Sequence, residues 1–165
     1  MQNISCDQAS LLRELHAFRG GVIDTSTLIY LERLGLLPRT VRCFSFLLIP
    51  QVVAEYGAQP EGVVLTAASS FGTTDEALCQ TARALGQPVL SEDKQVLRRA
   101  RALNLCFYNS LMIVLALCAQ GYLPLNTFPE LRDKLYAFSR YSPGVLAVGD
   151  AVYEALLRQM QANWR

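Results

Sequence analysis

Histidine is almost absent from this sequence, and His16 is the only one. A Ser–His or Cys–His catalytic pair therefore has a single residue on which it can be built. An excess of either charge is absent too, because 15 Lys and Arg face 14 Asp and Glu and leave a formal net charge of +1. Such a balance gives the chain no global field that attracts nucleic acid, so a nucleic-acid enzyme here needs a local basic patch.

Long hydrophobic runs, paired cysteines and phosphate-binding loops are also missing. The most apolar run, residues 111–118, is far shorter than the roughly 20 residues that a membrane-spanning helix requires. No signal peptide is evident at the N-terminus, and the five cysteines, none in a C-x-x-C pair, favour free thiols in a reducing compartment. We therefore expect a cytoplasmic protein. Neither a G-x-x-x-x-G-K loop nor a G-x-G-x-x-G loop occurs in the sequence.

What is present is enough apolar material for one domain, with 52% hydrophobic residues in a chain of 165. Apolar, strand-like runs at residues 21–26, 44–49, 63–65, 89–90 and 105–108 alternate with helical patterns. This alternation predicts an α/β fold, a three-layer α/β/α sandwich with a mostly parallel central sheet. Gly20-Gly21 is expected to end a first amphipathic helix over residues 7–18.

Four acidic residues lie near strand–helix junctions: Asp24, Glu55, Asp75 and Asp93. Because the carboxyl ends of parallel strands share one edge of a sheet, we expect several of these side chains to meet there. Carboxylates brought together resist ionising together. A hard cation such as Mg²⁺ or Mn²⁺ relieves that repulsion, since it prefers oxygen ligands.

Each acid also has an ordinary structural interpretation. Asp24 suits the cap of the following helix, and Glu55 suits a solvated helix face. Asp75, with Glu76 beside it, suits the positive first turn of a helix. Asp93 suits a surface ion pair. Taken singly, the residues leave both interpretations open, and the metal site is favoured by the order and context of all four.

These segments resemble the PIN-domain family of metal-dependent nucleases. Residues 22–26, Val-Ile-Asp-Thr-Ser, are similar to the opening strand of that family, and residues 49–55 are similar to its apolar-Pro-x-Val-x-x-Glu segment. Residues 74–78 and 90–94 resemble its third and fourth acidic motifs. The resemblance implies a single PIN-like domain over residues 1–165, with an N-terminal helical extension (1–20), a family-like core (21–123) and C-terminal helices (124–165).

One departure affects the third acidic motif. A PIN subgroup that the chain otherwise resembles carries Gly-Glu-x-Glu where this chain has Gly-Thr-Thr-Asp at residues 72–75. The third acid is therefore Asp75 or Glu76. Helical spacing favours Asp75, because it shares a stripe with Leu78 and Ala82 and so lies toward the core side of its helix.

The resemblance implies a metal-dependent endoribonuclease that hydrolyses RNA phosphodiesters. Asp24, Glu55, Asp75 and Asp93 would hold Mg²⁺ or Mn²⁺, and Ser26 would support them or contact the substrate phosphate. Many members are the toxins of toxin–antitoxin pairs, which suggests RNA as substrate and a small antitoxin protein as partner. The alternative is a PIN-like binding or assembly module with weak or no nuclease activity, which the neutral charge and the departure near Asp75 favour.

Two further surfaces concern partners. Lys94, Arg98, Arg99 and Arg101 form the densest basic cluster, which suits either a solvated helix face or phosphate contact. Residues 111–117 are apolar on nearly every helical face and should be buried all round. An apolar stripe outside the family-like region (Leu11, Leu12, Leu15 and Phe18) predicts a homodimer with two acidic pockets facing one groove.

Overall fold

The computed structural model describes residues 8–68 and 72–164. Outside the described part lie residues 1–7, 69–71 and 165. The described residues group into two compact units. The larger unit runs from Arg19 to Ser110, and the smaller one combines residues up to Phe18 with those from Leu111 onward. The larger unit thus ends ahead of residue 123, where the family-like core was expected to end, and the single-domain organisation stays a prediction.

A five-stranded sheet with the order β3-β2-β1-β4-β5 forms the centre of the larger unit. All its pairings are parallel, which confirms the predicted α/β class with a parallel sheet. The strands are β1 (Gly20–Ile23), β2 (Ser45–Leu48), β3 (Val64–Leu65), β4 (Val89–Leu90) and β5 (Phe107–Tyr108). Every residue of the adjacent strands β1 and β4 is buried, as expected in the middle of a parallel sheet.

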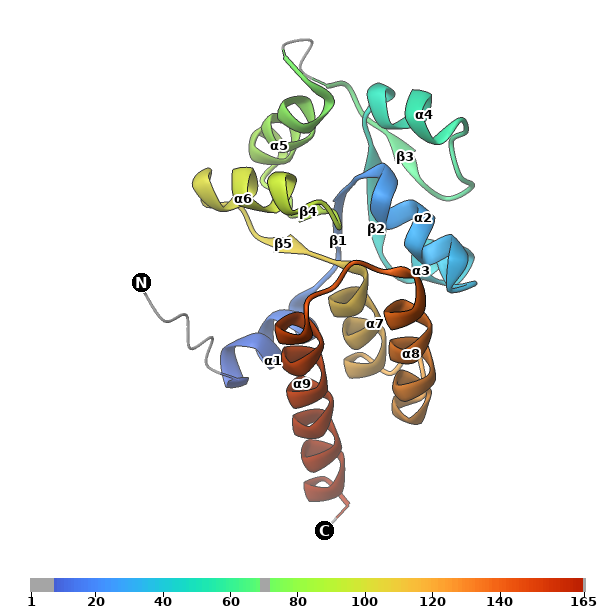
Figure 1. The fold of residues 1–165 in the computed structure, drawn as a ribbon, viewed down its shortest axis with the longest axis vertical. Coiled ribbons are helices and arrows are strands. Elements are labelled where there is room, and N and C mark those ends of the chain that lie inside the picture. Colours follow the sequence, from blue (N-terminus) through green and yellow to red (C-terminus); the bar gives the residue numbers. More distant parts are fainter. Residues whose placement is uncertain (1–7, 69–71, 165) are drawn as a thin grey trace. The chain divides into compact units, whose positions relative to one another are not determined.

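Helices cover the two faces of this sheet. They are α2 (Thr25–Arg33), α3 (Leu37–Cys43), α4 (Pro50–Tyr56), α5 (Thr74–Leu85) and α6 (Lys94–Ala102). Parallel crossovers are right-handed, so connections that run in opposite directions across the sheet place their helices on opposite faces. Figure 1 shows α2 and α4 on one side of β1, and α5 and α6 on the other. The predicted three-layer arrangement is confirmed within this unit.

Local signals explain where α5 begins and ends. The hydroxyl of Thr73 accepts a hydrogen bond from the backbone N–H of Glu76, and the Glu76 carboxylate accepts one from the N–H of Thr73. This reciprocal capping box is a strong helix start. Gly86 adopts a left-handed conformation at the C-terminus, where glycine avoids the clash of a side chain. Both ends of α5 are therefore set by local signals in the sequence.

The glycine pair ahead of Asp24 has a different place from the one predicted. Helix α1 (Gln8–Ala17) ends before Gly20, and the two glycines open β1 instead of ending the helix. Gly20 has a φ of +120°, and a Cβ there would lie 2.0 Å from the carbonyl oxygen of Ser45. At Gly21 a Cβ would lie 2.5 Å from the carbonyl oxygen of Pro88. The glycines are therefore required by the close approach of neighbouring backbones within the sheet.

Helix α3 lies directly ahead of the second strand. Leu37–Cys43 form this helix, and β2 then falls within the strand-like run predicted for residues 44–49. Pro38 lies in the first turn of this helix, where its missing N–H costs no hydrogen bond.

The smaller unit is helical and contains α1, α7 (Ser110–Ala119), α8 (Phe128–Phe138) and α9 (Pro143–Ala162). Residues 113–118 of α7 are all buried, as its apolar character on every face predicts. The stripe on α1 is buried as well, with exposed fractions from 0% at Leu15 to 8% at Leu11. This stripe is therefore not the exposed patch on which the homodimer was predicted. Among the described residues, no helix has both the length and the apolar character to span a membrane.

Candidate functional site

The strand order places a topological switch between β1 and β4. The chain leaves β1 toward β2 on one side of the sheet, and it reaches β4 only after crossing back to the other side. Ligand sites in sheets of this kind form outside the carboxyl ends of the strands at that point. Asp24 directly follows β1, and residues 91–93 directly follow β4. Two of the four predicted acids therefore flank the switch.

Asp24 is the buried member of the site, with 7% of its surface exposed. Its backbone N–H donates to the carbonyl of Leu90 at 2.8 Å, which fixes the residue against β4. One carboxylate oxygen accepts from the N–H of Thr25 at 2.8 Å, and the other accepts from the hydroxyl of Ser91 at 2.8 Å and of Ser26 at 3.3 Å. Asp24 is also the N-cap of α2. The cap interpretation of Asp24 is therefore confirmed, and its role as a metal ligand stays a prediction.

Burial raises the pKa of Asp24 above its usual value, because the charged form loses water. The hydrogen bonds from Ser91 and Thr25 oppose that rise. The negative charges of Asp75 and Glu55 add to it. Asp75 and Glu55 therefore lie within electrostatic reach of Asp24.

Asp75 belongs to the same group of charges. Partial burial raises its pKa, and the charge of Asp93 raises it further. The Arg99 guanidinium lowers the pKa of Asp75, whereas Glu55 raises it. Asp24, Glu55, Asp75 and Asp93 are therefore linked by mutual repulsion, although they come from four separate strand–helix junctions. We call these four side chains the acid cluster.

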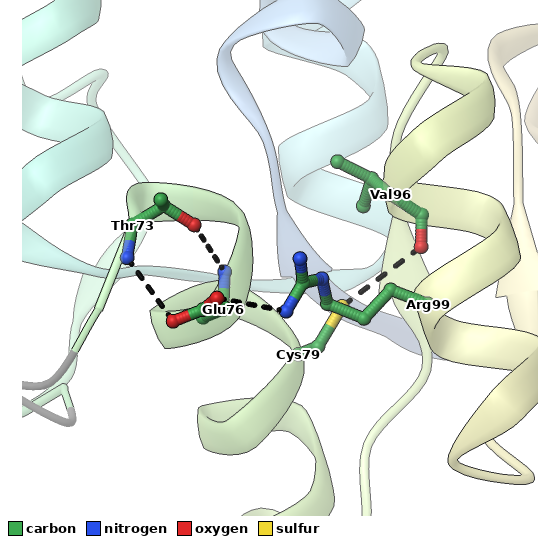
Figure 2. Close-up of polar contacts among 5 residues, drawn as sticks. All are labelled: Thr73, Glu76, Cys79, Val96 and Arg99. Carbon is green, nitrogen blue, oxygen red and sulfur yellow. Dashed lines mark hydrogen bonds and ion pairs between the residues drawn. The ribbon is translucent and has the colours of Figure 1, made fainter.

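Glu76, the other candidate for the third acid, is already engaged. Its carboxylate completes the capping box with Thr73 and forms an ion pair with Arg99, with 3.1 Å between Oε1 and Nη1. Figure 2 shows Thr73, Glu76 and Arg99 in this arrangement, with Cys79 donating to the carbonyl of Val96 behind them. Capping and pairing engage the Glu76 carboxylate, and its charge, like those of Asp93 and Glu55, raises the pKa of Asp75.

Glu55 and Asp93 are the exposed members of the acid cluster. Glu55 lies on α4, and its carboxylate accepts a hydrogen bond from the hydroxyl of Thr25 at 2.8 Å. Asp93 is the N-cap of α6 and accepts from the N–H of Gln95 at 2.7 Å.

Glu92 is a fifth carboxylate beside the cluster, and the sequence interpretation did not select it. It accepts hydrogen bonds from the buried hydroxyl of Thr27 and from the N–H of Ser110 at 2.9 Å. Its own N–H donates to the hydroxyl of Ser26 at 3.1 Å. Glu92 thus fixes the loop after β4 to the start of α2. No single-residue signal distinguishes it from a solvated glutamate, because its partners come from distant parts of the chain.

Ser91 was also missed as a site residue. It lies between β4 and the cap of the next helix, which is Asp93. The Ser91 hydroxyl donates to Asp24 and accepts from the N–H of Asp93 at 3.1 Å. Ser26, predicted as a supporting residue or phosphate contact, lies 3.4 Å from Ser91 between their hydroxyl oxygens and donates to Asp24. Whether Ser26 contacts a substrate stays a prediction.

The donors present suit a hard divalent cation, whereas their spacing is wider than one ion requires. Carboxylate oxygens are the ligands that Mg²⁺ and Mn²⁺ prefer, and their mutual repulsion is what a cation relieves. Within residues 8–68 and 72–164, however, no three His, Cys, Asp or Glu side chains are close enough to hold one ion together. Metal binding by the acid cluster therefore stays a prediction.

Comparison with known proteins gives one structural likeness. No protein-family model matches the chain, and no curated protein matches it in sequence. A solved structure of a PilT N-terminus (PIN) domain protein from the hyperthermophilic archaeon Sulfolobus solfataricus P2 is 16% identical, with a TM-score of 0.45. The match covers 59% of this chain and 93% of that one. With both values this low, the function proposed below rests on the acid cluster.

Proposed function

We propose that this chain is a metal-dependent endoribonuclease of the PIN class that hydrolyses RNA phosphodiesters. The observation that supports the proposal is the acid cluster at the carboxyl ends of parallel strands. Burial raises the pKa values of Asp24 and Asp75, and the charges of neighbouring acids in the cluster raise both further. Like charges gathered at a topological switch weaken the fold, and a bound cation would offset their repulsion.

Asp24, Glu55, Asp75 and Asp93 are the residues that would hold Mg²⁺ or Mn²⁺. When bound, such an ion lowers the pKa of a water molecule and stabilises charge on the phosphoryl oxygens. The chain itself supplies orientation: Ser91 and the N–H of Thr25 hold the Asp24 carboxylate, and the Thr25 hydroxyl holds Glu55. These fixed carboxylates would also orient the attacking water.

The test removes the charge of Asp24 with little change in shape. Asp24→Asn should lower Mn²⁺-dependent cleavage of single-stranded RNA by at least about 100-fold, because this carboxylate is the most firmly held of the four. The matched control is Glu130→Gln on α8, which also removes one carboxylate charge with little change in shape. The ion pair of Glu130 with Lys134 lies on an exposed helix face. Circular dichroism should show both variants folded. Undiminished cleavage by Asp24→Asn would exclude Asp24 from the active site.

Partners follow from the same proposal. A PIN-class toxin is neutralised by a small antitoxin protein, and we propose such a partner for this chain together with a homodimeric state. A short open reading frame that overlaps or directly precedes the coding sequence supports the toxin assignment. Co-purification of its product with this chain, and loss of cleavage in the complex, are the expected results.

A second candidate is a PIN-like binding or assembly module with weak or no nuclease activity. The observation that favours it is the spacing of the acid cluster, because the described residues contain no assembled group of three metal ligands. A module of this kind binds RNA or protein but leaves RNA intact at millimolar Mn²⁺. Titration of the purified protein with Mn²⁺ distinguishes the two candidates, since only the nuclease requires saturable metal binding that Asp24→Asn abolishes.

A further inference from the structure

An RNA strand that approaches the acid cluster meets strong electrostatic repulsion. The cluster contains four carboxylates, and Glu92 lies beside it. The whole chain carries a formal net charge of only +1, so no global field offsets this local negative charge. Phosphates therefore need cations close to the acid cluster, and these cations must be free of other partners.

The structure divides the basic cluster of α6 into engaged and free cations. Arg99 forms the ion pair with Glu76 shown in Figure 2. The Arg101 guanidinium carbon lies 5.5 Å from the ring centre of Phe107, in a cation–π contact. Across the described residues, no hydrogen bond or ion pair engages Lys94 or Arg98, and both side chains are exposed.

Lys94 and Arg98 lie on one face of α6. They are four residues apart, so they are neighbours along the helix, separated by about 6 Å of rise. This face is opposite the one that buries Val96 and Ala100. Because Lys94 directly follows Asp93, the pair of cations begins beside the acid cluster and extends one turn away from it.

We propose that Lys94 and Arg98 form a subsite for the phosphates of single-stranded RNA that flank the cleaved bond. The identity of the polymer as RNA rests on the proposed function, but phosphate binding by the two cations requires neither metal nor cleavage. A single strand can pass beside α6 and present successive phosphates to both cations. Without that role, they form an ordinary solvated helix face.

The experiment measures RNA binding apart from catalysis. Fluorescence anisotropy with the full chain in EDTA reports the affinity for a labelled single-stranded RNA between about 50 and 300 mM salt. Each phosphate contact contributes about 0.7 to the slope of log affinity against log salt for single strands. The double variant Lys94→Gln/Arg98→Gln should therefore reduce the slope by about 1.4 and weaken binding roughly tenfold at the lowest salt.

Charge-matched and charge-retaining variants complete the design. Arg42→Gln/Arg83→Gln removes the same net charge from the last turns of α3 and α5. These turns lead into β2 and β4 and so lie at the amino ends of the strands, away from the acid cluster. This control should keep the wild-type slope. Lys94→Arg/Arg98→Lys keeps both charges and should also keep it.

The outcomes separate this inference from the proposed nuclease activity. A reduced slope only in Lys94→Gln/Arg98→Gln supports the subsite, even if wild-type protein with Mn²⁺ fails to cleave the RNA and the nuclease proposal falls. An unchanged slope, an equal loss in the Arg42/Arg83 control, or no RNA binding by wild-type protein at 50 mM salt overturns the subsite. The same loss on single-stranded DNA assigns the contact to phosphate alone, whereas a loss confined to RNA adds a contribution from the ribose.

Discussion

Three consecutive hydroxyl residues, Thr25, Ser26 and Thr27, each donate to a different carboxylate. Their acceptors are Glu55, Asp24 and Glu92, respectively. A hydroxyl stabilises an anion without introducing a positive charge of its own. The three residues therefore keep neighbouring carboxylates in fixed positions while leaving their negative charge available to a cation.

Asp75 offers a test of the repulsion within the acid cluster. Its pKa is raised in the folded protein, first by partial burial and then by the charge of Asp93, so folding favours the protonated form. At pH 7 in EDTA, Asp75→Asn should therefore raise Tm. The gain should shrink as the pH falls through the raised pKa, and it should vanish below the unfolded value of 3.8, where Asp75 is protonated in both states.

Thermal unfolding followed by circular dichroism between pH 3.5 and pH 7 checks this prediction. Asp133→Asn is the control, because Asp133 is exposed and lies 3.6 Å from Arg132, so its neutralisation should give no gain. Saturating Mn²⁺ should stabilise the wild-type protein more than Asp75→Asn. A variant that is less stable than wild type at pH 7 would show that the helix macrodipole outweighs the repulsion at this residue.

The four acids could be selected from the sequence, and their role as metal ligands stays a prediction, whereas Ser91, which holds Asp24, was missed. Asp24 was recognisable because it ends a buried strand, and Asp75 because it lies on the apolar side of its helix. Ser91 and Asp93 are both good helix caps, two residues apart, so propensity alone does not decide between them. What decides between them is the hydrogen bond from Ser91 to Asp24, two residues that are 67 positions apart in the sequence.

At the scale of elements, both ends of α5 follow from local signals, whereas the strand pairing could not be predicted from the sequence. The capping box at Thr73 and the left-handed Gly86 are local signals. Strands β3, β4 and β5 contain only two residues each, so they carry no periodicity from which neighbours can be inferred. The prediction that Gly20-Gly21 end a helix was wrong, because glycine is required there by the close approach of the backbones beside β1.

Gly20→Ala tests that requirement. A methyl group at this residue would meet the backbone of Ser45 in β2, and the φ of +120° is unfavourable for alanine. We expect a loss of about 2–4 kcal/mol in the free energy of unfolding, from backbone strain and displacement of β2. Urea denaturation measures it.

Gly144→Ala is the matched control for this substitution. Gly144 lies in the first turn of α9, and the nearest atom to a Cβ there is the Ser142 Oγ at 3.8 Å. Alanine in a helix is favoured over glycine, so the control should be neutral or slightly stabilising. Equal losses in the two variants would contradict the close approach of β1 and β2.

For the whole molecule, the proposed homodimer needs a surface other than the α1 stripe, which is buried. The edge strand β3 offers one, because Val64 is 59% exposed and Leu65 is 48% exposed beside unpaired backbone groups. Static light scattering at micromolar concentration should give twice the chain mass of 18.3 kDa.

A lysine on this edge strand tests the location of the contact. Val64→Lys should shift the protein to monomer, because a charge on an edge strand opposes strand pairing. Val148→Lys on α9, where the valine is 55% exposed, is the control and should leave the mass unchanged. A monomeric wild-type protein refutes the dimer, and a dimer that survives Val64→Lys places the contact elsewhere.

The two pairings of β1 close loops of unequal length. Gly20 pairs with Ser45, whereas Val22 pairs with Val89, and the second loop is more than twice as long. Longer loops cost more chain entropy and slow the formation of contacts, so β1 can join β2 before it joins β4. Ser91 and Asp93 arrive only with β4. A nascent chain therefore carries Asp24 and Glu55 before the residues that complete the acid cluster have been synthesised.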